Sequence, residues 1–273
     1  MSTQAGPIEA PGADRAKRVG RLEPAALAGV MSRDIAIFGR YWKATTFSSI
    51  VQPTIYLLAF GLGVGTMVDV AGGTAYVEFV GTGTVATAVL FSSAFPGMFN
   101  TYVRRVFQRT YDAVLAAPVS VDELVTAEGS WIALKAGVYG TVPIIVTFFF
   151  GLAPSWGMLT IPFIAFLTGL GFAYFGMWVS AVVKTIDSFT YVTSAVLTPL
   201  FLLAGTFFPI ANLPQWAQVL AQFNPLYHCV KLVRDASFHW FPVEDLYHLS
   251  VLVVFALITW GLALGSLRGK LID

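Results

Sequence analysis

The sequence predicts an all-α integral membrane protein with six membrane-spanning helices. Of its 273 residues, 56% are apolar and only 11% are charged, and the mean hydropathy is +0.73. These values lie outside the range of soluble globular domains. A helix needs about 20 mostly apolar residues to cross the hydrocarbon core with its backbone hydrogen bonds satisfied. Six stretches meet this requirement, at residues 47–67, 79–100, 130–152, 158–183, 188–209 and 247–267.

The residues before the first predicted span divide into two parts. Residues 1–23 are rich in Gly, Pro, Ala and charge, which is typical of a disordered segment. Residues 24–46 repeat an apolar side chain every three or four positions. The repeating residues are Leu27, Val30, Met31, Ile35, Phe38 and Trp42. This pattern predicts an amphipathic helix lying in the membrane surface, and the alternative is an ordinary basic flank of the first span.

Lysine and arginine are distributed unequally between the two sides of the predicted spans. Thirteen lie in the N-terminal segment, in the segments after spans two and four, or after span six. On the other side, the two short loops have none, and the loop before the last span has only Lys231 and Arg234. Because positive flanking residues stay in the cytoplasm, both termini are predicted to be cytoplasmic. We therefore expect three parts, a cytoplasmic tail at 1–23, an interfacial helix at 24–46 and a membrane domain at 47–273.

Between spans two and three, the sequence predicts two helices that meet at a corner. Pro118 disfavours a helical conformation at the preceding residue, so it ends a first helix that begins near Tyr102. Ser120 has the side chain of an N-cap, and Glu123 follows at the capping-box spacing. Asp122 and Glu123 also place negative charge at the positive end of the second helix dipole. Ordinary helix termination would explain the same residues, so both interpretations stay open.

The corner lies within a run that resembles the signature region of the type-2 ABC exporter permeases, VRRVFQRTYDAVLAAPVSVDELVTAEGSW. It is especially similar to the nodulation-type lipo-oligosaccharide export permeases. In that family, an arginine-bearing helix is followed by Leu, a small or polar residue, Pro, a hydrophobic residue, Ser or Thr, and acids. The matching residues are Arg104, Arg105, Arg109, Leu115, Ala117, Pro118, Val119, Ser120, Asp122 and Glu123. Ala117 departs from the Thr of many members, which leaves the substrate subtype open.

The resemblance implies that the helix before Pro118 is a coupling helix, which docks into a groove on a separate ABC ATPase subunit. The residues implied in this coupling are Arg104, Arg105, Arg109, Leu115, Pro118, Ser120, Asp122 and Glu123. The expected assembly contains two copies of this chain and two ATPase subunits, which bind ATP and magnesium. This chain has no G-x-x-x-x-G-K-[ST] phosphate loop. We therefore expect it to be a transport subunit that has no ATPase site, binds no cofactor and is not an enzyme.

The remaining polar residues favour neither a metal site nor a nucleic-acid partner. His228, His239 and His248 lack a metal-ligand spacing, and the basic residues form no long run. Lys135 is the ionisable residue inside a predicted span, and we expect it to snorkel to the interface. A substrate contact is the alternative, and its carboxylate partner is either Glu128 or a residue of another span. The scarcity of charge in the spans argues against an ion-coupled carrier.

Two further segments suggest how a substrate is handled. Polar and aromatic residues on spans four and five are candidates for a substrate path, namely Tyr174, Phe175, Trp178, Thr190, Tyr191 and Thr193. Interhelical hydrogen bonds and interface belts would explain the same residues. Before the last span, two short apolar faces are separated by Pro225, with members Trp216, Leu220, Phe223, Leu226, Val230 and Val233. They predict two short helices, which the resemblance implies form a re-entrant hairpin in the outer leaflet.

Together these features predict the permease subunit of an ATP-driven exporter in the bacterial cytoplasmic membrane. The expected cargo is an amphipathic lipo-oligosaccharide or lipid-linked glycan, which moves outward past the bilayer. Export of drugs or other hydrophobic small molecules is the alternative within this class. An ion-coupled secondary carrier is the alternative from another class.

Overall fold

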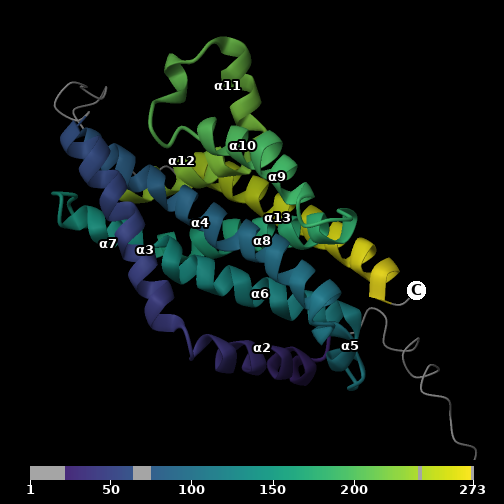
Figure 1. Cartoon of the computed structure of the whole chain (residues 1–273). Helices are drawn as coiled ribbons and strands as arrows, with labels where there is room; N and C mark the ends of the chain where they lie inside the picture. Colours follow the sequence, from purple (N-terminus) through teal and green to yellow (C-terminus); the bar gives the residue numbers. More distant parts are fainter. Residues whose placement is uncertain (1–21, 64–74, 239–241, 272–273) are drawn as a thin grey trace, which may run out of the picture.

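The structure is a computed structural model that describes residues 22–63, 75–238 and 242–271. Every regular element in these ranges is a helix (Figure 1). The predicted disordered tail at 1–23 lies outside the described residues, except for its last two positions.

The predicted interfacial segment is divided by a turn. Helix α2 (Pro24–Phe38) ends at Gly39, and α3 (Trp42–Tyr56) begins three residues later and continues into the π-helical segment η1 (Leu57–Leu62). Figure 1 shows α2 lying across one end of the bundle, beneath α6. Val30 is buried against other helices, whereas Ile35 is 51% exposed. The apolar stripe predicted to face lipid is therefore partly used to hold α2 onto the protein.

Four helical segments of the described chain are long and apolar enough to cross a membrane: Tyr76–Phe107, Val121–Phe148, Trp156–Val182 and Glu244–Leu271. They consist of α4 (Tyr76–Tyr102) with η2 (Val103–Phe107), α6 (Val121–Gly140) with α7 (Val142–Phe148), η3 (Trp156–Thr160) with α8 (Ile161–Val182), and most of α13 (Pro242–Leu271). These four correspond to the second, third, fourth and sixth predicted spans.

The other two predicted spans are not among these four segments of the described residues. The segment predicted at 188–209 forms an apolar run from Ser188 to Leu202, made of α9 (Ser188–Val192), η4 (Thr193–Leu197) and α10 (Thr198–Leu202). The segment predicted at 47–67 is helical to its last described residue, Gly63. A topology with six spans stays a prediction.

Helix α8 occupies the centre of the bundle and packs against α4, α6 and α13 (Figure 1). Its contact with α4 is a direct approach of two backbones at Gly97 and Gly176. A Cβ atom at Gly176 would lie 2.5 Å from the carbonyl oxygen of Ala94, and one at Gly97 would lie 2.5 Å from that of Ala173. Close packing of small residues is a common way to join helices in membranes.

The two short helices predicted before the last span are present. A 3₁₀ turn, η5 (Ile210–Asn212), leads into α11 (Gln215–Gln222), and α12 (Pro225–Phe238) follows. The predicted apolar face of α12 is buried, including Leu226 and Val230, whereas Trp216 and Phe223 of the other face are 65% and 80% exposed. The re-entrant placement of this hairpin stays a prediction.

Candidate functional site: the elbow between α5 and α6

The chain turns sharply twice between α4 and α6. The π-helical segment η2 extends α4 to Phe107, and Arg109 then adopts a left-handed conformation with φ of 50°. A short helix, α5 (Thr110–Leu115), follows before the turn at Pro118. The prediction of one helix from Tyr102 to the proline is therefore wrong, because the break at Arg109 leaves only α5 before the corner. We call residues 108–123 the elbow.

The capping box predicted at the start of α6 is confirmed. The Glu123 backbone N–H donates to Ser120 Oγ at 3.2 Å, and the Ser120 N–H donates to Glu123 Oε2 at 2.8 Å. The other carboxylate oxygen, Oε1, accepts from the backbone N–H of Glu23 at 2.8 Å. Glu123 therefore caps its own helix and also fixes the residue that precedes α2.

A buried ionic cluster lies on the next turns of α6. Glu128 Oε1 is 2.5 Å from Arg33 Nη2 and 2.7 Å from Arg104 Nη1, and its Oε2 accepts a hydrogen bond from the Tyr111 hydroxyl. Asp34 Oδ1 lies 3.2 Å from Arg104 Nη1. Two arginines thus offset two carboxylates, which is what burial of charge requires. We call Arg33, Asp34, Arg104, Tyr111 and Glu128 the Glu128 cluster.

Tyr111 is the α5 member of this cluster, and its side chain is fully buried. Burial, together with the adjacent Glu128 carboxylate, raises the pKa of Tyr111 well above its usual value. The phenol therefore stays protonated, and its O–H group donates a hydrogen bond to Glu128. This contact couples α5 directly to α6.

Two further contacts join the elbow end of the bundle to α8 and α13. Arg268 near the end of α13 forms a bidentate pair with Asp122, at 2.6 Å to Oδ1 and 2.5 Å to Oδ2. Arg105 Nη2 donates to the backbone oxygen of Ser180 on α8 at 2.7 Å. Planar bidentate pairs fix geometry as well as charge. The start of α6 is therefore attached to α2, α4, α5 and α13.

A cavity of about 540 Å³ lies beside these contacts, between α2 and the elbow. Gly29, Val30 and Arg33 line it from α2, and Pro118 and Val119 line it from the elbow. The elbow therefore has an exposed turn at Pro118 and a cavity directly beside it.

Residues 26–238 match the family model described as "ABC-2 type transporter". The chain belongs to this family. Nodulation protein J of Rhizobium leguminosarum bv. trifolii is 33% identical over 85% of this chain and 90% of its own length. Nodulation protein J of Neorhizobium galegae is 32% identical over 93% and 99%, respectively. The inner membrane transport permease YadH of Escherichia coli K12 is 28% identical over 87% and 94%. ABC-2 permeases are membrane subunits of transporters.

In this ABC-2 chain, the residues predicted to couple to an ATPase fall into two groups. Arg104, Arg105, Asp122, Ser120 and Glu123 form the internal contacts described above. Arg109 and Pro118 are exposed at the two turns of the elbow, and Leu115 is half-buried at the end of α5. A docking surface for a partner would use the second group, together with Phe107, which is 66% exposed.

The six residues predicted for a substrate path are also divided in the ABC-2 chain. Tyr174 is buried, donates to the backbone oxygen of Thr126 at 3.3 Å and packs beneath Gly129. Phe175 and Trp178 are half-buried neighbours on α8, with ring centroids 5.8 Å apart. On the run from α9 to η4, Tyr191 and Thr190 are exposed and Thr193 is half-exposed. The α8 residues pack inside the chain, so exposed contact with a substrate would come from the second group.

Lys135 points toward α2 in this ABC-2 chain. Its Nζ lies 5.9 Å from the ring centroid of Phe38 and 5.7 Å from that of Trp131. The Glu128 carboxylate, one of the two partners considered for Lys135, instead accepts from Arg33, Arg104 and Tyr111. The roles of Arg33, Asp34 and Tyr111 were not predicted, because their partners lie far away along the chain. The available signal was an acidic residue, Glu128, directly before the third predicted span.

Proposed function

We propose that this chain is the six-span permease subunit of an ATP-binding-cassette exporter in the bacterial cytoplasmic membrane. A second copy completes the transport path, and two separate ATPase subunits bind ATP with magnesium and supply the energy. Both termini and the elbow lie on the cytoplasmic side, which the distribution of lysine and arginine supports. The tail at 1–23 and the interfacial segment at 24–46 belong to the same side.

The observation that carries this proposal is the set of contacts at the start of α6. Within about three turns of Pro118, α6 is bonded to the residue before α2 through Glu123, to η2 and α5 through Glu128, and to α13 through Asp122. A displacement of α5 by a partner therefore reaches several helices at once. Coupling between distant sites is carried by such chains of packed and bonded elements.

The mechanism follows from this arrangement. ATP-driven closure of the ATPase subunits pushes on the exposed turns of the elbow, at Arg109 and Pro118. Tyr111 and Glu128 pass the movement into α6 and α4, and the Asp122–Arg268 pair passes it into α13. The spans tilt, and the path between the two copies opens outward. No covalent chemistry is needed from this chain, since its work is mechanical.

We infer that the cargo is an amphiphile with a lipo-oligosaccharide or lipid-linked glycan structure. The resemblance of the elbow sequence and the name shared by the nodulation protein J relatives support this class. The exposed Thr190 and Tyr191 would meet it along α9. Export of drugs or other hydrophobic small molecules is the second candidate, because the name of YadH specifies transport without a cargo.

The proposal is tested by purifying the chain together with a Walker-motif ATPase and measuring ATP-dependent export in vesicles. Arg109→Glu should reduce ATPase copurification, because it reverses an exposed charge at the elbow. Arg40→Glu reverses a charge on the exposed turn between α2 and α3 and serves as the matched control. The double variant Pro118→Ala, Glu123→Ala should keep the ATPase bound but separate hydrolysis from export.

Two outcomes would contradict the proposal. Uphill export by the purified chain without any ATPase would remove the need for coupling. Export that persists without ATP and collapses with the ion gradient would show a secondary carrier.

A further inference from the structure

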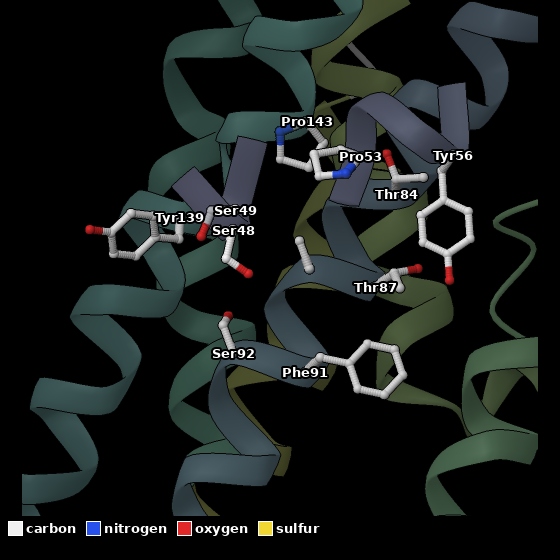
Figure 2. Close-up of a pocket in the computed structure, with 11 residues that line it drawn as sticks. Ser48, Ser49, Pro53, Tyr56, Thr84, Thr87, Phe91, Ser92, Tyr139 and Pro143 are labelled. Atoms are coloured by element: carbon white, nitrogen blue, oxygen red, sulfur yellow. The ribbon is translucent and has the colours of Figure 1, made fainter. Parts of the chain in front are cut away.

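A second cavity, of about 200 Å³, lies between α3, the middle of α4 and the junction of α6 with α7 (Figure 2). None of the eleven described residues that line it carries a formal charge, and seven of them carry a hydroxyl group. One of the seven, Tyr139, is bonded through its hydroxyl to Thr46 at 3.0 Å. The other six are Ser48, Ser49, Tyr56, Thr84, Thr87 and Ser92. None of the predicted path residues lines this cavity.

Several of these hydroxyls are arranged to accept hydrogen bonds. Thr84 Oγ1 donates to the Gly81 oxygen at 2.7 Å, and Ser49 Oγ donates to the Thr45 oxygen at 2.8 Å. A hydroxyl has one proton and two acceptor lone pairs, so both groups keep their acceptor capacity. Pro53, inside α3, has no N–H to give to the Ser49 carbonyl four residues earlier. The cavity wall is therefore rich in acceptors.

Thr87 lines the cavity on α4, and no described residue pairs with its hydroxyl group. Its side chain is 3% exposed, and its Oγ1 has no hydrogen-bond partner among the described residues. Buried hydroxyls are almost always paired, so an unpaired one at a cavity indicates a missing partner. Unlike Thr84 and Ser49, Thr87 has a hydroxyl proton that no described residue accepts, so it is able to donate as well as accept.

The lining selects a narrow class of ligand. A phosphate or carboxylate group would need a cation or a set of N–H donors to offset its charge inside the membrane domain, and the lining residues that the structure describes include no cation. An uncharged group with several hydroxyls would match the acceptors, and Tyr56 and Phe91 offer aromatic faces for its ring. Sites for drug-sized ligands have volumes of about 300–1,000 Å³, so this cavity suits a single ring.

We propose that this cavity binds one uncharged, hydroxyl-rich ring, such as the sugar of an amphiphile's head group. This inference rests on the proposed export function, because it supplies a place for the polar part of the cargo within one copy of the chain. The ring would enter from the side of α3, whose Ser48 is exposed, and donate to Thr84 and Ser49 while pairing with Thr87.

The test uses the full chain with its ATPase in phosphatidylcholine nanodiscs, with octyl glucoside below its micellar concentration as the probe. We expect a saturable rise in melting temperature that octyl phosphocholine, with the same chain and a charged head group, does not produce. Free glucose identifies the source of the ligand: a response to glucose shows that the ring alone binds, and a response to the glucoside alone shows that the amphiphile is required. Equal responses to octyl glucoside and octyl phosphocholine would overturn the proposal.

Thr87→Val separates binding from folding. It removes the unpaired hydroxyl at nearly constant shape, so the melting temperature without ligand should stay the same or rise. The affinity for octyl glucoside should fall about fivefold to tenfold. Thr82→Val is the matched control, since Thr82 is buried on the same helix outside the cavity and bonds its own backbone. An unchanged affinity in Thr87→Val would refute the site. ATPase copurification, measured on the same samples, tests the export proposal separately.

Discussion

Glu128 receives hydrogen bonds from three segments of the chain: Arg33 on α2, Arg104 on η2 and Tyr111 on α5. Its side chain is 2% exposed, so solvent does not replace a lost partner. Removing its charge would leave two arginines close to each other with only Asp34 to offset them. Glu128 is therefore the residue on which the elbow depends most.

We predict that Glu128→Gln lowers the free energy of unfolding by about 3 kcal/mol, the usual cost of breaking a buried ion pair. The change should appear as a lower melting temperature of the purified protein. Asp112→Asn is the control, because it makes the equivalent substitution at an exposed position of α5. Equal melting temperatures for the two variants would show that the cluster does not stabilise the fold.

His228 and His248 form a buried pair, with 2.6 Å between their Nδ1 atoms. His228 Nε2 lies 2.8 Å from the Gln222 oxygen. A carbonyl only accepts, so His228 carries its proton on Nε2 and its Nδ1 accepts from His248. A second proton on His228 would place two N–H groups against each other as long as His248 keeps its proton on Nδ1. The neutral pair thus joins α12 to α13.

Burial lowers the pKa of His228 below its usual value of about 6.5. The unfolded state therefore binds a proton more readily than the folded state, so stability should fall as the pH drops below about 6.5. Melting temperatures measured across this range should decline more in the wild type than in His228→Gln. The comparison isolates His228 from other acids that titrate nearby, and parallel curves would show that His228 makes no contribution.

The elements of the elbow differ in how clearly the sequence specifies them. Pro118, Ser120 and Glu123 act on residues within a few positions of themselves, and the corner and capping box they predict are present. No glycine or proline lies near Arg109 to indicate that the helix breaks there, so the sequence predicted one long helix. Arg104 pairs with a residue 24 positions away, and Arg33 with one 95 positions away. Such pairings depend on helix packing, which local patterns do not encode.

Helices α4 and α8 meet at two glycines, Gly97 and Gly176, which have no side chain. At Gly176, an added Cβ atom would lie within 3.0 Å of backbone atoms of Ala94, Gly97 and Met98. Backbone gives way less easily than a side chain, so the two helices would have to separate. The central contact of the bundle therefore depends on this glycine.

We predict that Gly176→Ala destabilises the protein by about 1–3 kcal/mol, the range typical of overpacked contacts. Gly265→Ala is a matched control on α13, because a Cβ atom there would meet nothing within 4 Å. In the interior of a helix that change should be neutral or slightly stabilising. Melting temperature and yield after purification report both effects. Equal losses in the two variants would rule out the backbone contact as the cause.

Over the whole molecule, hydropathy and charge predicted the class of protein and four spans that the structure supports. They did not predict how the helices are connected at the elbow end, because each connection is a contact between distant segments. The Asp122–Arg268 pair is an ionic contact that joins the first turn of α6 to the last turns of α13, beside apolar packing of the same two segments. In the proposed mechanism, this pair transmits movement of the elbow to α13.

Arg268→Met should therefore lower export while ATP hydrolysis by the complex continues. Some loss of stability is expected as well, because solvent reaches the 36% exposed Arg268 side chain but hardly reaches the Asp122 side chain, which is 5% exposed and loses this cation. Lys270→Met removes a charge from an exposed residue two positions later and should leave export unchanged. The measurement is the ratio of cargo exported to ATP hydrolysed in vesicles. If that ratio stays at the wild-type value in Arg268→Met, the Asp122–Arg268 pair does not transmit the movement. The movement must then pass through the Glu128 cluster or through the other contacts of α6 with α13, such as the Trp260–Thr126 hydrogen bond.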